Sequence, residues 1–165
     1  MFALFIISFG ILSRLIVHTP NFTPILSMAL LAGIYLKGRQ AVVVPLVLMV
    51  ISDFLIGFYG KEMLFTWAAI MLVSLVGVWL KAKKSLATVL GGSIGSALVF
   101  FIVSNLGSWL TLYPHTVKGL QQCYIMAIPF FRSSLISTVA YSLVFYAGYE
   151  WMIKRSQGTA LARML

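Results

Sequence analysis

Residues 87–110 read ATVLGGSIGSALVFFIVSNLGSWL, and no charged side chain interrupts them. The run is longer than the ~20 apolar residues that carry an α-helix across the ~30 Å hydrocarbon core of a membrane. The rest of the 165-residue chain has the same character, because 61% of all residues are hydrophobic and 9% are charged. Soluble domains carry about 25% charged residues, so the composition predicts an integral membrane protein.

Glycine, proline and clusters of basic residues divide the chain into six apolar segments. The predicted fold is all-α, a bundle of six transmembrane helices over residues 1–153 with a short cytoplasmic tail over residues 154–165. The second helix is short for a span, so we expect the polar stretch before it to dip into the protein; a re-entrant hairpin is the alternative. The predicted helices are Phe2–Val17, Thr23–Leu36, Ala41–Phe58, Met63–Leu80, Ala87–Leu110 and Tyr124–Ile153.

Lysine and arginine are concentrated on one side of this predicted topology. Cytoplasmic loops carry the excess of basic residues, so we expect both termini in the cytoplasm and a multi-pass protein of a bacterial cytoplasmic (inner) membrane. We attribute the net charge of +9 to this topology and to anionic membrane lipids, and we expect no nucleic-acid partner. The predicted cytoplasmic side holds Lys37, Arg39, Lys81, Lys83, Lys84, Lys154, Arg155 and Arg163, and the other side holds Lys61 and Lys118.

Arg14, Asp53 and Arg132 lie inside predicted helices, toward the non-cytoplasmic side. A charged side chain deep in a bilayer costs roughly 2.5–3.5 kcal/mol, so such residues pair with each other or face a polar cavity. One carboxylate and two guanidinium groups at similar depth predict a shared ion-pair network with one positive charge left over. The spare arginine would bind a carboxylate, phosphate or carbonyl group of a ligand. The alternative is an internal staple, with one arginine extending to the lipid headgroups.

Other polar and aromatic residues gather on the same side, as in a pocket where aromatic faces pack a flat ligand and amides fix its orientation. For the aromatic residues, anchoring at the membrane interface is the alternative. No set of residues typical of an enzyme, a metal site or a cofactor site is present, so we expect a protein that is not an enzyme. The candidate substrate-binding residues are Arg14, His18, Asn21, Asp53, Asn105, Trp109, Tyr113, Tyr124 and Arg132.

Small residues recur at a spacing of four in two predicted helices. They are Ala29 and Gly33 in one, and Gly91 and Gly95, overlapped by Gly92 and Ser96 and by Ser93 and Ala97, in the other. Such faces let helix backbones approach closely. We expect both faces to pack inside the bundle; a docking surface for a partner is the alternative.

The order of the polar motifs resembles the substrate-binding S-components of energy-coupling factor (ECF) vitamin transporters. Within that superfamily it is similar to a bacterial family of proposed transport proteins. The resemblance runs from about residue 10 to residue 152. It rests on the motifs HTPNFTP (18–24), SDFLIG (52–57), SNLGSW (104–109), YPHTVKGL (113–120), CY (123–124) and IPFFR (128–132).

This resemblance implies capture of a scarce small nutrient, a vitamin or vitamin precursor, from the outer face and its release inward. The partners it implies are a membrane subunit and two ATPases that energise transport. S-components typically carry an Ala-xxx-Ala motif on the first helix for that subunit. Phe2–Val17 has no such pair, and its nearest small residues are Ser8, Gly10 and Ser13. A protein that works alone is therefore the alternative.

The single Cys123 is expected to be a small buried hydrophobe. The resemblance leaves a second interpretation open, since some solitary S-component-like proteins handle cobalamin with a cysteine near the outer site. Cys123 would then be a ligand to a metal-containing substrate. The functional alternative to uptake is an accessory subunit of a larger membrane complex, without a ligand of its own.

Overall fold

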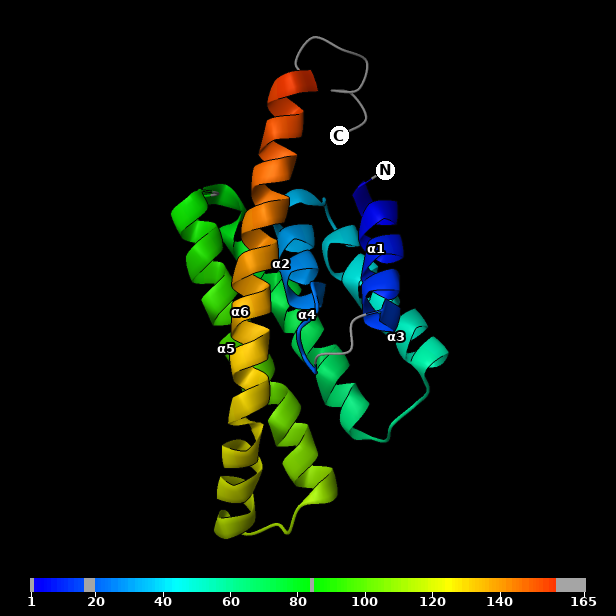
Figure 1. Cartoon of the computed structure of the whole chain (residues 1–165), viewed down its shortest axis with the longest axis vertical. Helices are drawn as coiled ribbons and strands as arrows, with labels where there is room; N and C mark the ends of the chain where they lie inside the picture. Colours follow the sequence, from blue (N-terminus) through cyan, green and yellow to red (C-terminus); the bar gives the residue numbers. More distant parts are fainter. Residues whose placement is uncertain (1, 17–19, 84, 157–165) are drawn as a thin grey trace.

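The computed structural model describes residues 2–16, 20–83 and 85–156, and the regular structure in these ranges is helical (Figure 1). The all-α prediction is thereby confirmed. Three segments, Glu62–Lys83, Leu86–Leu112 and Val117–Arg155, are long and apolar enough to cross a membrane. The helices are α1 (Phe2–Ile16), α2 (Ile25–Tyr35), α3 (Gln40–Ile56), α4 (Glu62–Leu80), α5 (Leu86–Leu112) and α6 (Val117–Ser156), with a short 3-10 helix, η1 (Lys81–Lys83), after α4.

Helix α2 lies at the centre of the bundle and contacts the other five α-helices (Figure 1). Its sequence, ILSMALLAGIY, is apolar on every side and has no charged residue, and a helix of that kind is stable only where it is surrounded. All residues from Ile25 to Ile34 are buried. The core of the protein is therefore built around this short helix.

Glycine allows α2 to approach α4 closely. A Cβ atom added at Gly33 would collide with the backbone of Ser74 and Gly77, and one added at Gly77 would collide with the backbone carbonyl of Leu30. Backbone atoms cannot move aside as a flexible side chain can. The small-residue face predicted at Ala29 and Gly33 does pack inside the bundle, where Ala29 is fully buried.

The corresponding prediction for α5 is confirmed for Gly92, Ser93, Ser96 and Ala97, which are buried, and wrong for Gly91 and Gly95. Nothing lies within 4 Å of a Cβ atom added at Gly91 or Gly95, whereas one added at Gly92 would meet the side chain of Leu80. The helix is rotated so that Gly92 and its neighbour Ser93 face the core. Gly91 and Gly95 consequently lie on an open face of α5.

Helix α6 is longer than predicted, because it begins at Val117 rather than Tyr124. The Thr116 hydroxyl accepts the backbone N–H of Gly119 at 3.0 Å, which caps the first turn, and Pro114 precedes it. At 1.5 Å per residue its 40 residues extend about 60 Å, roughly twice the thickness of a bilayer core. The other predicted bounds agree better, and α2 to α5 begin and end within two residues of them.

The basic segments predicted to be cytoplasmic lie together at one end of the bundle (Figure 1). The Lys81 ammonium group donates to the carbonyl of Leu36 at 2.7 Å, which joins η1 to the end of α2. The Tyr35 hydroxyl donates to the Glu150 carboxylate at 3.0 Å, which brings the last turns of α6 to the same place. Of the basic residues assigned to this side, Lys84 and Arg163 lie outside the described residues.

We expect Gly33→Ala to lower the thermal stability of the detergent-purified protein, because its Cβ would overpack the contact with α4, at a cost of about 1–3 kcal/mol. Gly91→Ala is the matched control, since open space surrounds that position and alanine favours the helix by about 0.5–1 kcal/mol. Equal melting temperatures of the two variants would contradict the close approach of α2 and α4.

Candidate functional site

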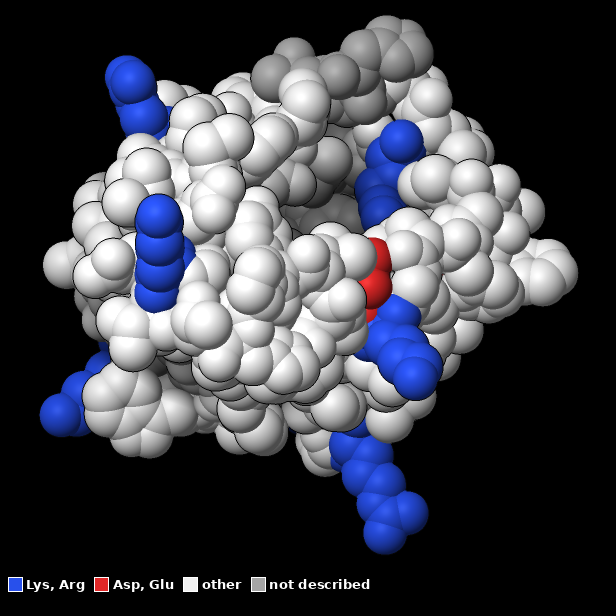
Figure 2. Space-filling model, turned by 90° about the horizontal axis from the view of Figure 1, so that it is seen from below, with Lys and Arg blue, Asp and Glu red and all other residues white. Residues whose placement is uncertain are grey.

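A cavity of about 440 Å³ opens at the end of the bundle where α1 ends and α2 begins. Its floor includes Ile25 and Leu26, the first residues of α2, and its walls come from α1, α3, α4, α5 and α6. The first N–H groups of α2 point toward this end, as at the start of any α-helix, and no side chain caps them. Seen from below, the same end of the molecule is hollowed near its centre (Figure 2).

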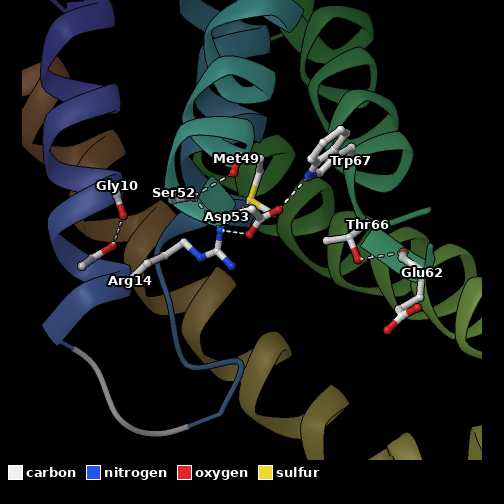
Figure 3. Close-up of polar contacts among 9 residues, drawn as sticks. Gly10, Arg14, Met49, Ser52, Asp53, Glu62, Thr66 and Trp67 are labelled. Carbon is white, nitrogen blue, oxygen red and sulfur yellow. Dashed lines mark hydrogen bonds and ion pairs between the residues drawn. The ribbon is translucent and has the colours of Figure 1, made fainter. Parts of the chain in front are cut away.

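An ion pair between α1 and α3 stands at the wall of this cavity (Figure 3). Nη1 of Arg14 lies 2.5 Å from Oδ1 of Asp53 and 2.5 Å from the hydroxyl oxygen of Ser52. The same nitrogen is 3.7 Å from the sulfur of Met49. Met49, Ser52 and Asp53 share one face of α3 because they are three and four residues apart, so one guanidinium nitrogen meets all of them.

Asp53 is fully buried and both of its carboxylate oxygens are engaged. Its second oxygen, Oδ2, accepts the indole N–H of Trp67 in α4 at 2.7 Å (Figure 3). The guanidinium group and the indole N–H replace the hydrogen bonds to water that the buried carboxylate has lost. Asp53 therefore fixes the position of Arg14 and does not itself line the cavity.

Arg14 uses only one of its three nitrogens in these contacts. Nε and Nη2 also carry N–H groups, and the described residues provide no hydrogen-bond partner for them. Arg14 lines the cavity and its side chain is 16% exposed. The N–H groups of Nε and Nη2 are thus hydrogen-bond donors held in a fixed position at the cavity wall. The negative charge of Asp53 balances the positive charge of the guanidinium group.

The α5 wall has the opposite hydrogen-bonding character. Nδ2 of Asn105 donates to the carbonyl of Phe101 at 2.7 Å, and the hydroxyl of Ser104 donates to the carbonyl of Phe100 at 2.6 Å. The hydroxyl of Ser108 donates to the carbonyl of Ser104 at 3.3 Å. The two hydroxyl hydrogens and one of the two amide hydrogens of Asn105 are therefore directed along the helix, and the side-chain oxygens keep lone pairs that can accept.

Aromatic rings supply much of the remaining wall. Phe100 and Phe101 of α5 and Phe130 and Phe131 of α6 line the cavity, and the rings of Phe101 and Phe131 are 4.8 Å apart between centroids. Tyr59, in the connection between α3 and α4, also lines it. Burial raises the pKa of Tyr59, so its hydroxyl keeps its proton and can donate or accept.

The structure brings together part of the predicted site. Arg14, Asn21 and Asn105 line one cavity, and Asp53 lies directly behind Arg14. Asn21 has a positive φ of 59°, a conformation that asparagine adopts more readily than most residues, and its carbonyl accepts the hydroxyl of Ser137 at 3.4 Å. His18, which was predicted to share a face with Arg14, lies outside the described residues.

Other predicted residues lie in the hairpin of α5 and α6, away from the cavity lining. The indole N–H of Trp109 donates to the carbonyl of Pro114 at 3.2 Å, and the hydroxyl of Tyr124 donates to the carbonyl of Ile102 at 2.7 Å. Tyr113 is half-buried at the end of α5. Cys123 is buried with its sulfur 3.4 Å from the carbonyl of Asn105, the surroundings of a small hydrophobe. These contacts hold the hairpin together.

Arg132 is not part of the ion-pair network, contrary to expectation. The ion pair found among the described residues joins Arg14 to Asp53, and Arg132 is exposed. Ala127, Phe131 and Ser134 line the cavity at helical spacing. Arg132 follows Phe131 directly, so its side chain is turned away from that residue by about 100° around the helix axis. The charge left over by the pairing is therefore on the outside of α6.

Several lining residues were missed by the sequence analysis. Ser104 and Ser108 stand four residues apart in an apolar helix, a polar face that could have been recognised beside Asn105. Ser134 has a similar signal, since it is one of several hydroxyl residues in α6. Tyr59 and Thr66 line the cavity only because the connection before α4 folds back, and no local pattern indicates that.

We expect Asp53→Asn to destabilise the protein by about 3–5 kcal/mol, because it leaves the Arg14 guanidinium partly buried without a counter-charge. Combining it with Arg14→Met should recover part of this loss. Glu62→Gln, the same chemical change at the partly exposed start of α4, should cost less than about 1 kcal/mol. Thermal and denaturant unfolding in detergent measure these differences. Similar losses for Asp53→Asn and Glu62→Gln would mean that the ion pair does not stabilise the fold.

Comparison with known proteins assigns the chain to a family. No curated protein and no solved structure matches it. A protein-family model, described as a family of unknown function (DUF6580), matches residues 1–161. Because that match covers nearly the whole sequence, the chain belongs to the DUF6580 family.

Proposed function

We propose that this protein binds a small nutrient in the cavity beside Arg14 and takes it up across a bacterial cytoplasmic membrane, in the manner of an ECF S-component. The observation that carries the proposal is the half-engaged guanidinium group of Arg14. One of its nitrogens is anchored on the buried Asp53, and the others are left to a cavity of about 440 Å³. Pockets for small ligands have volumes of about 300–1,000 Å³.

A purely structural ion pair explains this arrangement less well. A charge buried only to join α1 to α3 would be expected to use its remaining N–H groups within the protein, because unsatisfied donors in apolar surroundings are costly. Here those groups border an opening that also presents the oxygens of Ser104, Asn105 and Ser108. Convergence of donors, acceptors and aromatic rings on one hollow favours ligand binding.

In the proposed topology all six helices cross or enter the membrane, both termini are cytoplasmic, and the cavity opens outward. The clustering of basic segments at the end opposite the cavity supports this orientation. Helices α1 to α3 are shorter than a full span. Helices α4 to α6, which pack beside them, are long enough to cross the bilayer. An ECF-type membrane subunit with ATPases is the partner that the resemblance implies, and action without it is the alternative.

The open glycine face of α5 favours a second candidate function. Gly91 and Gly95 have nothing within 4 Å of an added Cβ atom, so another transmembrane helix could approach there. In that case the protein would be an accessory subunit of a larger membrane complex. Mild extraction distinguishes the two functions, because an accessory subunit should copurify with a large assembly and should carry no small molecule.

We expect native mass spectrometry of the mildly extracted protein to detect a retained small molecule, and Arg14→Lys to remove it. Lysine keeps a positive charge beside Asp53 but lacks the planar fork that presents additional N–H groups. Arg132→Lys is the matched control and should retain the molecule, because Arg132 is exposed outside the cavity. A wild-type protein without any bound molecule, or equal retention by both variants, would refute the proposed site.

A further inference from the structure

The two sides of the cavity have different hydrogen-bonding roles. Arg14, at the end of α1, presents donors, and the start of α2, which no side chain caps, lies at the floor. Another wall, formed by α5, presents the oxygens of Ser104, Asn105 and Ser108. The two hydroxyl hydrogens and one of the two amide hydrogens of Asn105 are bound to carbonyls of the preceding turn. A ligand that satisfies both sides must accept at one edge and donate at another.

The charges at the cavity favour a neutral ligand. Among its described lining residues Arg14 alone is charged, and Asp53 neutralises it from 2.5 Å away. A ligand carboxylate at Arg14 would bring a second negative charge close to Asp53, and no other described residue of the lining carries a positive charge to balance it. A carbonyl oxygen accepts the same hydrogen bonds without that repulsion.

The shape of the middle of the cavity favours a flat ring. Phe100 and Phe101 of α5 and Phe130 and Phe131 of α6 line the cavity. Such walls pack a planar ligand well, and they provide no partners for the many hydroxyl groups of a sugar. Other polar side chains, those of Asn21, Thr23, Tyr59, Thr66 and Ser134, also line the cavity.

We infer that the ligand is an uncharged planar heterocycle with a carbonyl group at one edge and an N–H group at another, as in a cyclic amide or imide. The carbonyl accepts from Arg14 and the N–H donates to the oxygens of α5. This inference rests on the proposed function and narrows its substrate to one chemical class.

Three probes of similar size test the inference by isothermal titration and thermal shift with the full-length purified protein. Quinazoline-2,4-dione is neutral and planar, with carbonyl and N–H groups. Its 1,3-dimethyl derivative keeps the carbonyls and has no N–H donor, and 2-naphthoate is a planar anion. We expect the dione to bind, methylation to weaken binding by about tenfold because the α5 oxygens lose their partners, and 2-naphthoate to bind more weakly than the dione.

Asn105→Leu provides a variant that separates recognition from stability. Its amide N–H contacts only its own helix, so leucine should be accommodated there, and the melting temperature without probe checks this. We expect the variant to lose affinity for the dione and to keep its affinity for the dimethyl derivative, so that the tenfold preference disappears. An unchanged preference for the dione over its dimethyl derivative would show that the α5 oxygens do not accept a hydrogen bond from the ligand.

The inference is overturned if 2-naphthoate binds as tightly as the dione, if methylation has no effect, or if none of the three probes binds. These outcomes do not decide the proposed function, which depends separately on whether Arg14→Lys loses a molecule that the wild-type protein retains. A retained molecule that is anionic would keep the proposed function and reject the neutral heterocycle.

Discussion

The ion pair between Arg14 and Asp53 is the interaction on which the site depends. It joins the ends of α1 and α3 in surroundings that are otherwise apolar, where a lone charge would cost several kcal/mol. Trp67 of α4 holds the other carboxylate oxygen, so three helices meet at one buried aspartate. This arrangement fixes the direction of the guanidinium group, and with it the donors that border the cavity.

The cavity exists because the central helix is short. Helix α2 has 11 residues and rises only about 16 Å, roughly half of a bilayer core. Its first residues, Ile25 and Leu26, end the packed core and form a floor. The longer helices α4, α5 and α6 continue past that level and become walls. A hollow lined by polar and aromatic residues therefore lies over a floor that is fully packed on its other side.

That packing has a consequence for uptake. Toward the end that carries the basic segments, α2 is buried on all sides, and its backbone touches that of α4 at Gly33 and Gly77. A ligand in the cavity thus has an open path toward one end of the bundle and a closed core toward the other. In the proposed uptake cycle, release to the cytoplasm would require α2 to move relative to α4, or the whole bundle to reorient in the membrane as the resemblance to S-components implies. Either motion has to preserve or replace the buried pair of Arg14 and Asp53.

The sequence by itself determined that the chain forms helices, three of them long and apolar enough to cross a membrane, and that Asp53 pairs with a partly buried basic residue. These features follow from composition, from the length of apolar runs and from the cost of buried charge, which act locally along the chain. The tertiary structure decided which face each helix presents. It placed Arg132 and the pair Gly91 and Gly95 outside, and it engaged Trp109 and Tyr124 within the α5–α6 hairpin. The physical reason is that successive helical residues differ by about 100° in direction, so the packing of the whole bundle, and no local pattern, selects the residues that share a cavity.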